Sequence, residues 1–257
     1  MLQRLWRAWA GRAPPLQDLP WDDWAAAFAR VPVLAHWPAD DRERLRQLAA
    51  HFLAEKVIEP VDGLTVEPAS RLALALQAAL PVLNLGLEWY RGWHAVVLYP
   101  DEFRSRFEEV DEAGVVHQIE DWRGGESWTA GPLILSLAEV AASGQGYGYN
   151  VVVHECAHKL DQLDGDANGC PPLHAGMDRT AWSEAFTAAF RDLRRRALRR
   201  LHTVLDPYAA ESPGEFFAVA SELFFEDPWR LKLGYAAVYE QLGRFYRQDP
   251  ASLRVPP

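Results

Sequence analysis

The spacing of hydrophobic and polar residues divides the chain into a helical first part, a strand-forming middle and a helical last third. From Trp21 to about Leu53, apolar residues recur every three or four positions, which is typical of helices that bury one face. A further helix, rich in Ala and Leu, is expected from Pro68 to Leu80. The period then changes to that of strands. Strands are predicted at Trp93–Tyr99, Val115–Trp122 and Pro132–Leu137, and a short strand or turn between Lys56 and Glu67.

The last third is predicted to contain three helices, at Ala181–Leu201, Pro213–Phe225 and Asp227–Tyr246. The second has a strong start signal, because Ser212 can cap it, Pro213 suits its first position and Glu215 its third. Its interior is apolar on nearly every side, so a carboxylate there requires a partner. This order of elements predicts an α+β fold with a small mixed or antiparallel sheet. Residues 1–20 are expected to form a short basic amphipathic helix and a proline-bounded connector.

The segment Asn150–Gly165 (N-V-V-V-H-E-C-A-H-K-L-D-Q-L-D-G) contains an H-E-x-x-H motif and is predicted to be helical, with Asn150 as N-cap. In a helix, His154 and His158 lie about 40° apart around the axis and one turn apart along it, so both can bind one metal ion. Glu155 then lies beside the metal, where its carboxylate can accept a proton from water. The alternative is two histidines placed by chance on an amphipathic helix. The rest of this turn is apolar, however, and buried polar groups need partners.

Composition narrows the class of protein. The chain has 257 residues, of which 49% are hydrophobic and 24% charged, as in an ordinary globular protein. Its two cysteines exclude a disulfide scaffold and favour reduced thiols in a reducing compartment.

Charge excludes further classes of function. A net charge of −10 argues against direct nucleic-acid binding. The arginine-rich run from Arg191 to Arg200 is therefore interpreted as a solvated or partner-facing helix surface. No apolar run approaches the roughly 18 residues that a membrane span requires. Arg4 and Arg7 interrupt any core of an export signal, so a cytoplasmic location is expected.

A catalytic zinc site usually has three protein ligands, so the H-E-x-x-H helix needs one more. Asp161, seven residues after His154 on the same helix stripe, is better placed to orient a ligand imidazole. No third histidine follows at the metzincin spacing. Glu215 and Glu222 lie seven residues apart on one buried helix, so one can bind the metal while the other holds a ligand histidine, and the residues alone do not decide which. The full set of candidates is Asp161, His174, His202, Glu211, Glu215 and Glu222.

Three blocks of the chain resemble one known family. They are N-V-V-V-H-E-C-A-H-K-L-D-Q-L-D-G-D-A-N-G-C-P-P-L, the upstream G-E-S-W-T-A-G-P-L-I-L-S, and D-P-Y-A-A-E-S-P-G-E-F-F-A-V-A-S-E-L-F-F. Together they look like the Mlc titration factor A (MtfA) family of peptidases, over roughly residues 80–245. More faintly, the chain is similar to the catalytic domain of anthrax lethal factor, in which a tyrosine and, seven residues later, a metal-binding glutamate follow the H-E-x-x-H motif.

The resemblance implies a zincin-like fold of gluzincin type, with the sheet packed on the H-E-x-x-H helix. It implies an N-terminal helical region (1–80) packed on a catalytic region (81–257), together in one compact domain. One Zn²⁺ per chain would be bound by His154, His158 and Glu215. Glu155 would be the general base and Tyr208 a hydroxyl near the metal, while Glu222 and Asp161 would support the ligands.

The resemblance implies a cytoplasmic zinc-dependent peptidase or aminopeptidase that also binds the Mlc repressor of sugar-uptake genes. One alternative is a non-catalytic zinc-containing scaffold that sequesters such a repressor. Glu155 argues against it, because a structural zinc site is closed by four ligands and has no use for a base. A zinc hydrolase acting on a non-peptide amide is a third reading. Cys156 replaces a bulkier apolar residue of the family, and a thiol there suggests sensitivity to oxidation.

Overall fold

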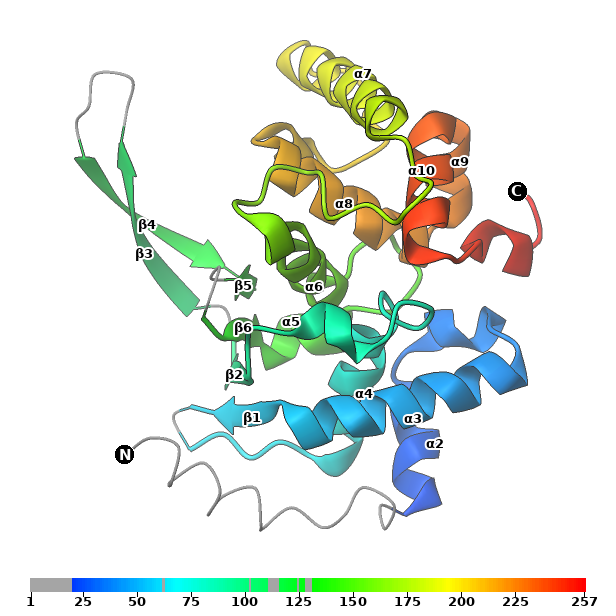
Figure 1. Cartoon of the computed structure of the whole chain (residues 1–257). Helices are drawn as coiled ribbons and strands as arrows, with labels where there is room; N and C mark the ends of the chain where they lie inside the picture. Colours follow the sequence, from blue (N-terminus) through cyan, green and yellow to red (C-terminus); the bar gives the residue numbers. More distant parts are fainter. Residues whose placement is uncertain (1–19, 62, 102, 111–115, 124, 128–130) are drawn as a thin grey trace.

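Helix α6 (Val151–Asp161), which carries the H-E-x-x-H motif, lies at the centre of the computed structural model, and all of its residues are buried (Figure 1). The structure describes residues 20–257 except 62, 102, 111–115, 124 and 128–130. The expected N-terminal helix therefore lies outside the described residues. Asn150 caps α6 as predicted, since its side chain accepts a hydrogen bond of 3.0 Å from the Val153 N–H.

The first part of the chain is helical, as its periodicity predicts, and two α-helices share the region up to residue 55. α2 (Trp21–Ala29) is followed by a short 3₁₀ helix (Pro32–His36) before α3 (Ala39–Glu55), because Pro32 and Pro38 prevent one continuous helix. α4 is apolar almost all round and packs against α2, α3 and α6. The bounds are α2 (Trp21–Ala29), η2 (Pro32–His36), α3 (Ala39–Glu55), α4 (Pro68–Ala79) and η3 (Leu87–Tyr90).

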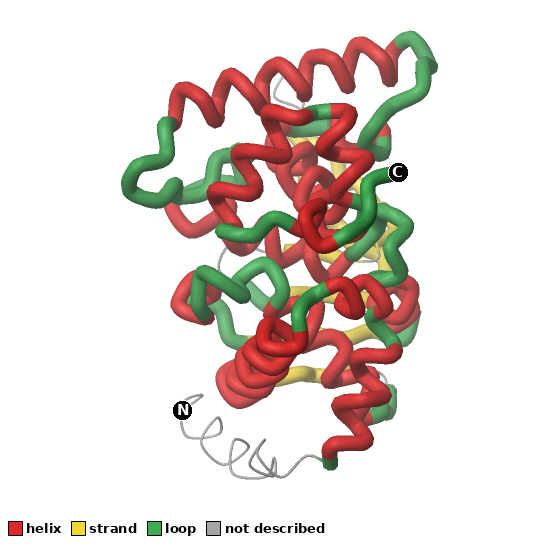
Figure 2. Tube along the Cα trace, turned by 90° about the vertical axis from the view of Figure 1, so that its right-hand side faces the viewer, coloured by secondary structure: helices red, strands yellow, loops and turns green. Residues whose placement is uncertain are grey.

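A small mixed sheet packs against α6, in agreement with the α+β prediction. Its strands are β1 (Val57–Pro60), β2 (Ala95–Tyr99), β6 (Leu133–Ser136) and β5 (Gly125–Ser127), in that spatial order. The first three are parallel, and β5 pairs antiparallel with β6. α6 packs on β5 and β6, and the strands lie together behind the helices in Figure 2. The strand predicted at Pro132–Leu137 is β6, which is internal to the sheet, and β5 forms the edge among the described strands.

A separate hairpin, formed by β3 (Phe103–Val110) and β4 (Val116–Arg123), projects from the body beside the sheet (Figure 1). β4 was predicted from its sequence. β3 was not, because half of its residues are Arg or Glu, a composition that strands usually lack. The order of strands along the chain also did not reveal that this hairpin stands apart from the main sheet.

The helices of the last third differ from the prediction at one position. The single helix expected over 227–246 is two helices, which separate at Tyr235 (φ −136°, ψ 67°). Gly234 lies close to the Val204 side chain there, since a Cβ at Gly234 would be 2.5 Å from it. The bounds are α5 (Leu137–Ala142), η4 (Gln162–Asp164), α7 (Arg179–Leu198), η5 (Pro207–Ala210), α8 (Pro213–Glu226), α9 (Pro228–Gly234), α10 (Ala236–Tyr246) and η6 (Pro250–Leu253).

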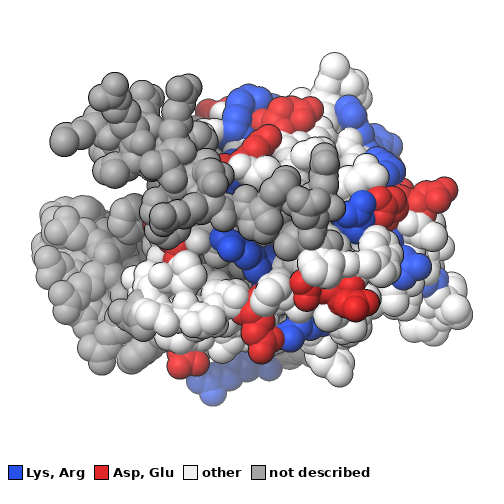
Figure 3. Space-filling model, turned by 90° about the horizontal axis from the view of Figure 1, so that it is seen from below, with Lys and Arg blue, Asp and Glu red and all other residues white. Residues whose placement is uncertain are grey.

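One cluster of buried hydrophobic residues extends from α2 to η6 and includes the apolar residues of α4, α6 and α8. The division of the chain near residue 80 stays a prediction. No helix among the described residues is long and apolar enough to cross a membrane. On the face drawn in Figure 3, the coloured basic and acidic side chains lie interspersed, without one continuous patch of either sign.

Candidate metal centre

Three side chains from two helices meet beside the buried face of α6. The Nε2 atoms of His154 and His158 lie 3.2 Å apart. Glu215, from the first turn of α8, places its Oε2 atom 3.1 Å from the Nε2 of His154 and 3.4 Å from that of His158. Among the residues that the structure describes, this is the one group of three or more His, Cys, Asp or Glu side chains close enough to share an ion.

The triangle of donor atoms fits a metal ion. Zinc binds imidazole nitrogen and carboxylate oxygen at roughly 2.0–2.2 Å in tetrahedral geometry, so neighbouring ligand atoms lie about 3.3–3.5 Å apart. The three observed separations are close to that value. Two neutral imidazoles and one carboxylate are also a donor set that zinc favours.

A second carboxylate of α8 orients the first histidine. Glu222 accepts a hydrogen bond of 2.7 Å from the Nδ1 of His154 through Oε1, and one of 2.6 Å from the Asn150 N–H through Oε2. In a neutral imidazole whose Nδ1–H is held in this way, the lone pair for a metal is on Nε2, and Nε2 is the atom facing Glu215. In the structure, the two candidates that the sequence left open contact different nitrogens of His154, since Glu215 meets Nε2 and Glu222 meets Nδ1.

Sequence reasoning missed a third carboxylate on the same stripe of α8. Glu226 accepts hydrogen bonds from the Asn150 Nδ2 (2.9 Å) and from the Gly146 N–H (2.6 Å). It fixes the start of α6 against α8 and does not reach the histidines. The signal was available, because Glu215, Glu222 and Glu226 recur at spacings of seven and four in an otherwise apolar helix.

The hydrogen bonds between the histidines and Glu215 shift the pKa values of His154 and Glu215 in opposite directions. Burial alone would lower the pKa of His154, but its hydrogen bonds to Glu215 and Glu222 raise that pKa well above its ordinary value. A metal ion bound at Nε2 would replace the proton held there, since a ligand imidazole must be neutral. Burial would raise the pKa of Glu215, whereas hydrogen bonds from His154 and His158 bring it far below its ordinary value. A carboxylate at Glu215 is therefore ionised at neutral pH, as a metal ligand must be.

Glu155 and Tyr208, the two residues predicted to take part in chemistry, come from α6 and η5. Glu155 is 4% exposed and lies on the turn of α6 that joins His154 to His158. Tyr208, in η5, is 39% exposed, and its ring centroid is 6.2 Å from that of His154. The Tyr208 ring therefore lies beside His154, and Glu155 is on the helix turn between the two histidines.

Comparison with known proteins agrees with this geometry. Residues 5–247 match the family described as glucose-regulated metallo-peptidase M90. A protein named Mlc titration factor A from Klebsiella pneumoniae subsp. pneumoniae is 36% identical over 239 residues, which are 92% of this chain and 89% of the relative. The protein of the same name from Edwardsiella ictaluri is 38% identical over 246 residues, or 94% and 92% of the two chains.

The chain belongs to the MtfA family. Its family is thus one of metallo-peptidases, and the resemblance inferred from the three sequence blocks is confirmed. Membership of this family implies a bound metal ion. The two histidine nitrogens and the Glu215 oxygen are a suitable set of ligand atoms for one.

Asp161 is expected to orient a ligand imidazole, but in this structure its carboxylate has other partners. Its carboxylate accepts hydrogen bonds from the N–H groups of Gly169 (2.7 Å) and Cys170 (3.0 Å). Burial raises the pKa of Asp161 to about 6 despite these bonds. No described residue accepts a hydrogen bond from the Nδ1 of His158. Asp161 therefore anchors the loop after α6, and this loop covers the start of α8.

The remaining candidates for a third ligand lie outside the group. The Nε2 of His174 bonds to the Phe245 carbonyl at 2.8 Å, and its ring packs against Trp89.

Cys156 also differs from its expected behaviour. It is fully buried, and burial raises the pKa of its thiol to about 12, which opposes the thiolate that oxidation requires.

Gly169 tests how closely the loop must fit α8. It has a φ of +78°, and a Cβ there would lie 2.4 Å from the Pro213 carbonyl oxygen. We expect Gly169→Ala to lower the free energy of unfolding by about 2–4 kcal/mol, through strain and the backbone clash. Gly176→Ala is the control, because Gly176 has a φ of +92° but no neighbour within 4 Å. Urea titrations of both variants measure the difference; equal losses would show that the clash costs nothing.

Proposed function

We propose that this protein is a zinc-dependent peptidase of zincin-like fold, with His154, His158 and Glu215 as zinc ligands. The observation that carries the proposal is the triangle of three donor atoms with 3.1–3.4 Å sides, formed by an H-E-x-x-H helix and a glutamate of a second helix. Within the part of the chain that the structure describes, three protein donors meet there, which suits a catalytic site, since a structural zinc site has four.

The residues around the ligands would divide the chemistry among them. When bound, zinc would supply Lewis-acid polarisation of a carbonyl group and a lowered pKa for water. Glu155 would accept the proton from the attacking water and return it to the leaving amine. Tyr208 would donate a hydrogen bond to the oxygen that becomes negative as the carbonyl is attacked. Glu222 would keep His154 in the required tautomer.

The edge of the sheet suggests how a peptide would bind. Among the described residues, β5 is the outermost strand and packs beside α6, and no described strand pairs with its outer edge, which an extended chain could therefore join. A peptide that adds to this edge would be held by backbone hydrogen bonds, with its scissile bond carried past the histidines. We propose peptides as the substrate class, with aminopeptidase action as the specific form to test.

The test is hydrolysis of matched peptides that differ only in a free or acetylated N-terminus. The zinc-loaded protein is expected to cleave peptides that have a free N-terminus. Loss of cleavage in their acetylated counterparts would identify an aminopeptidase. Chelation should abolish cleavage, and added Zn²⁺ should restore it. Absence of cleavage by protein that contains stoichiometric zinc would contradict the peptidase.

Removal of the metal is also expected to destabilise the fold. Zinc bound at about 1,000 times its Kd would add about 4 kcal/mol to the free energy of unfolding. For a protein of this size that corresponds to roughly 8–16 °C in Tm. Scanning calorimetry of the zinc-loaded and chelated protein measures the shift. An unchanged Tm would mean that the three donors do not bind zinc tightly.

A second function is proposed because the relatives carry the name Mlc titration factor A. We propose that this chain binds a transcription repressor of the Mlc type in the cytoplasm. Pull-down of a purified Mlc-type repressor by the wild-type protein and by Glu155→Gln separates the two functions. Binding by both would assign a scaffold role that needs no catalysis, and binding by neither would remove this second function.

A further inference from the structure

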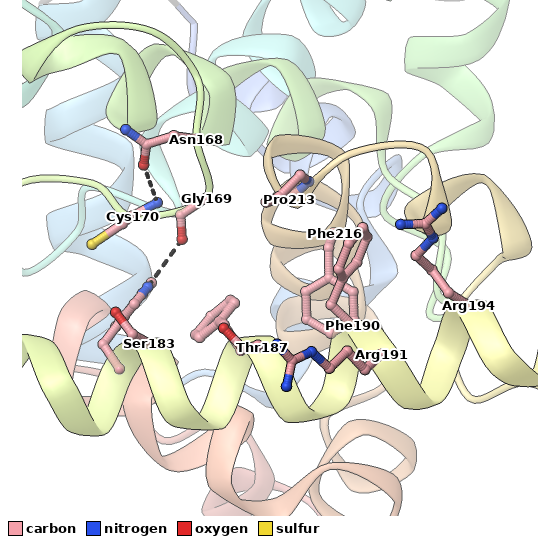
Figure 4. Close-up of a pocket in the computed structure, with 12 residues that line it drawn as sticks. Asn168, Gly169, Cys170, Ser183, Thr187, Phe190, Arg191, Arg194, Pro213 and Phe216 are labelled. Atoms are coloured by element: carbon pink, nitrogen blue, oxygen red, sulfur yellow. Dashed lines mark hydrogen bonds between the residues drawn. The ribbon is translucent and has the colours of Figure 1, made fainter.

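A cavity of about 340 Å³ lies between α7, the start of α8 and the loop at residues 168–170 (Figure 4). Its inner wall is aromatic. Trp182, Phe186 and Phe216 are buried, and Phe190 is partly exposed. Trp182 and Phe186 stack at 4.3 Å, and Phe216 meets the edges of Phe186 and Phe190. The volume is at the lower end of the roughly 300–1,000 Å³ usual for small-molecule sites.

The rim of this cavity is positively charged. Arg191 and Arg194 lie at the end that Phe190 and Phe216 line (Figure 4). The Arg194 guanidinium is 5.6 Å from the Phe190 ring centroid. No Asp or Glu is among the twelve lining residues, although the chain has 36 acidic residues against 26 basic ones. An anion placed here would find two cations and no nearby competing carboxylate from the lining.

Neighbouring arginines of α7 show what sets these two apart. Arg195 and Arg196 both pair with Asp192. Within the described part of the chain, Arg191 and Arg194 form neither an ion pair nor a hydrogen bond through their side chains. The arginine-rich run of α7 therefore contains two kinds of arginine. Arg195 and Arg196 pair with Asp192, whereas Arg191 and Arg194 line the cavity.

We propose that this cavity binds an organic carboxylate with an aromatic body, such as a phenylalanine residue with a free carboxyl group. The ring would stack among Phe190, Phe216 and the inner aromatic wall, where aromatic pairs are favourable. The carboxylate would accept charge-assisted hydrogen bonds from a guanidinium group of this rim. The same chemistry is offered by a free acyl amino acid and by the C-terminal residue of a peptide.

The polar groups of the opposite end would complete recognition. Asn168 and Ser183 lie there, and the Trp182 Nε1–H donates a 2.9 Å hydrogen bond to the Gly169 carbonyl across the inner wall. Gly169 in turn abuts Pro213, two residues before Glu215. The cavity therefore shares a wall with the start of the helix that carries the proposed metal ligand, but none of the proposed ligands lines it.

N-acetyl-L-phenylalanine is the probe, and isothermal titration of the zinc-loaded full chain measures its binding. The carboxamide analogue, which lacks the negative charge, and N-acetylglycine, which lacks the ring, should each bind at least about tenfold more weakly. The Arg191→Gln/Arg194→Gln variant should lose about tenfold or more in affinity. Arg42→Gln/Arg199→Gln makes the same change in net charge at exposed arginines outside the cavity and should bind as the wild type does.

Carboxylates also bind zinc, so the titration is repeated after chelation. Binding that persists without metal and is lost in Arg191→Gln/Arg194→Gln supports the cavity, whatever the outcome of the peptidase assay. Binding that vanishes with the metal and survives in that variant would place the ligand at the metal centre and overturn the proposal, as would absence of binding at 10 mM, a concentration on the order of the weakest ligands of such sites.

The location of binding and the source of the ligand have separate readouts. The Trp182 indole N–H signal in a ¹H–¹⁵N spectrum, assigned with Trp182→Phe, should shift on addition of the probe. An unshifted signal at saturation would contradict the cavity site. A short acetylated peptide ending in phenylalanine is then titrated: tighter binding than the single residue assigns a peptide C-terminus as the ligand, and equal or weaker binding assigns the free acid.

Discussion

Replacing Glu155 by glutamine is expected to lower kcat for peptide hydrolysis by about 10²–10⁴-fold, the range that a general acid–base residue usually contributes. Glutamine has nearly the same size and shape as glutamate but cannot accept the proton. Glu155 is buried beside the histidines and is not among the three donor atoms that face one another. The zinc content of the variant should therefore stay at one ion per chain, as measured by inductively coupled plasma mass spectrometry.

The matched control is Glu184→Gln, which makes the same chemical change at an exposed position of α7. It should leave both kcat and zinc content unchanged. The informative result is the combination of retained zinc and lost turnover in Glu155→Gln. Retained zinc with kcat within threefold of the wild type would remove Glu155 from the reaction, and another base would have to be sought.

The local parts of the fold could be predicted because their signals are short-range. Asn150 and Ser212 cap α6 and α8 as expected, and each cap depends on a hydrogen bond only three residues away. The H-E-x-x-H spacing likewise fixes two imidazoles on one face of one helix. The small mixed sheet followed from the order of elements.

The contacts between elements could not be predicted in the same way. Glu215 and Glu222 lie on one stripe of α8, so periodicity makes them equivalent. They are separated by about 10 Å along the helix axis, and the crossing of α8 over α6 decides which nitrogen of His154 each one meets. The edge strand was missed for a similar reason, because strand order depends on long-range pairing and not on the pattern within β5 or β6.

The exchange of Glu215 for glutamine is expected to lower zinc affinity by more than about 100-fold, whereas Glu222→Gln should lower it by about 10–100-fold. Glu215 offers its Oε2 to both histidines' metal-facing nitrogens, and an amide oxygen carries no charge to offset that of Zn²⁺. Glu222 accepts from the His154 Nδ1–H and from the Asn150 N–H. Glutamine has one acceptor oxygen for these two donors, so His154 loses part of its orientation but keeps Nε2.

Competition with a fluorescent zinc chelator measures both affinities, and circular dichroism checks that each variant is folded. Glu226→Gln is the control on the same stripe of α8, because Glu226 bonds Asn150 and Gly146 and touches neither histidine's Nε2. It should alter stability more than zinc affinity. The decisive comparison is the order of the first two variants. If Glu222→Gln abolished zinc binding while Glu215→Gln kept it, the bound metal would lie on the Nδ1 side of His154, and the proposed assignment of the third ligand would be wrong.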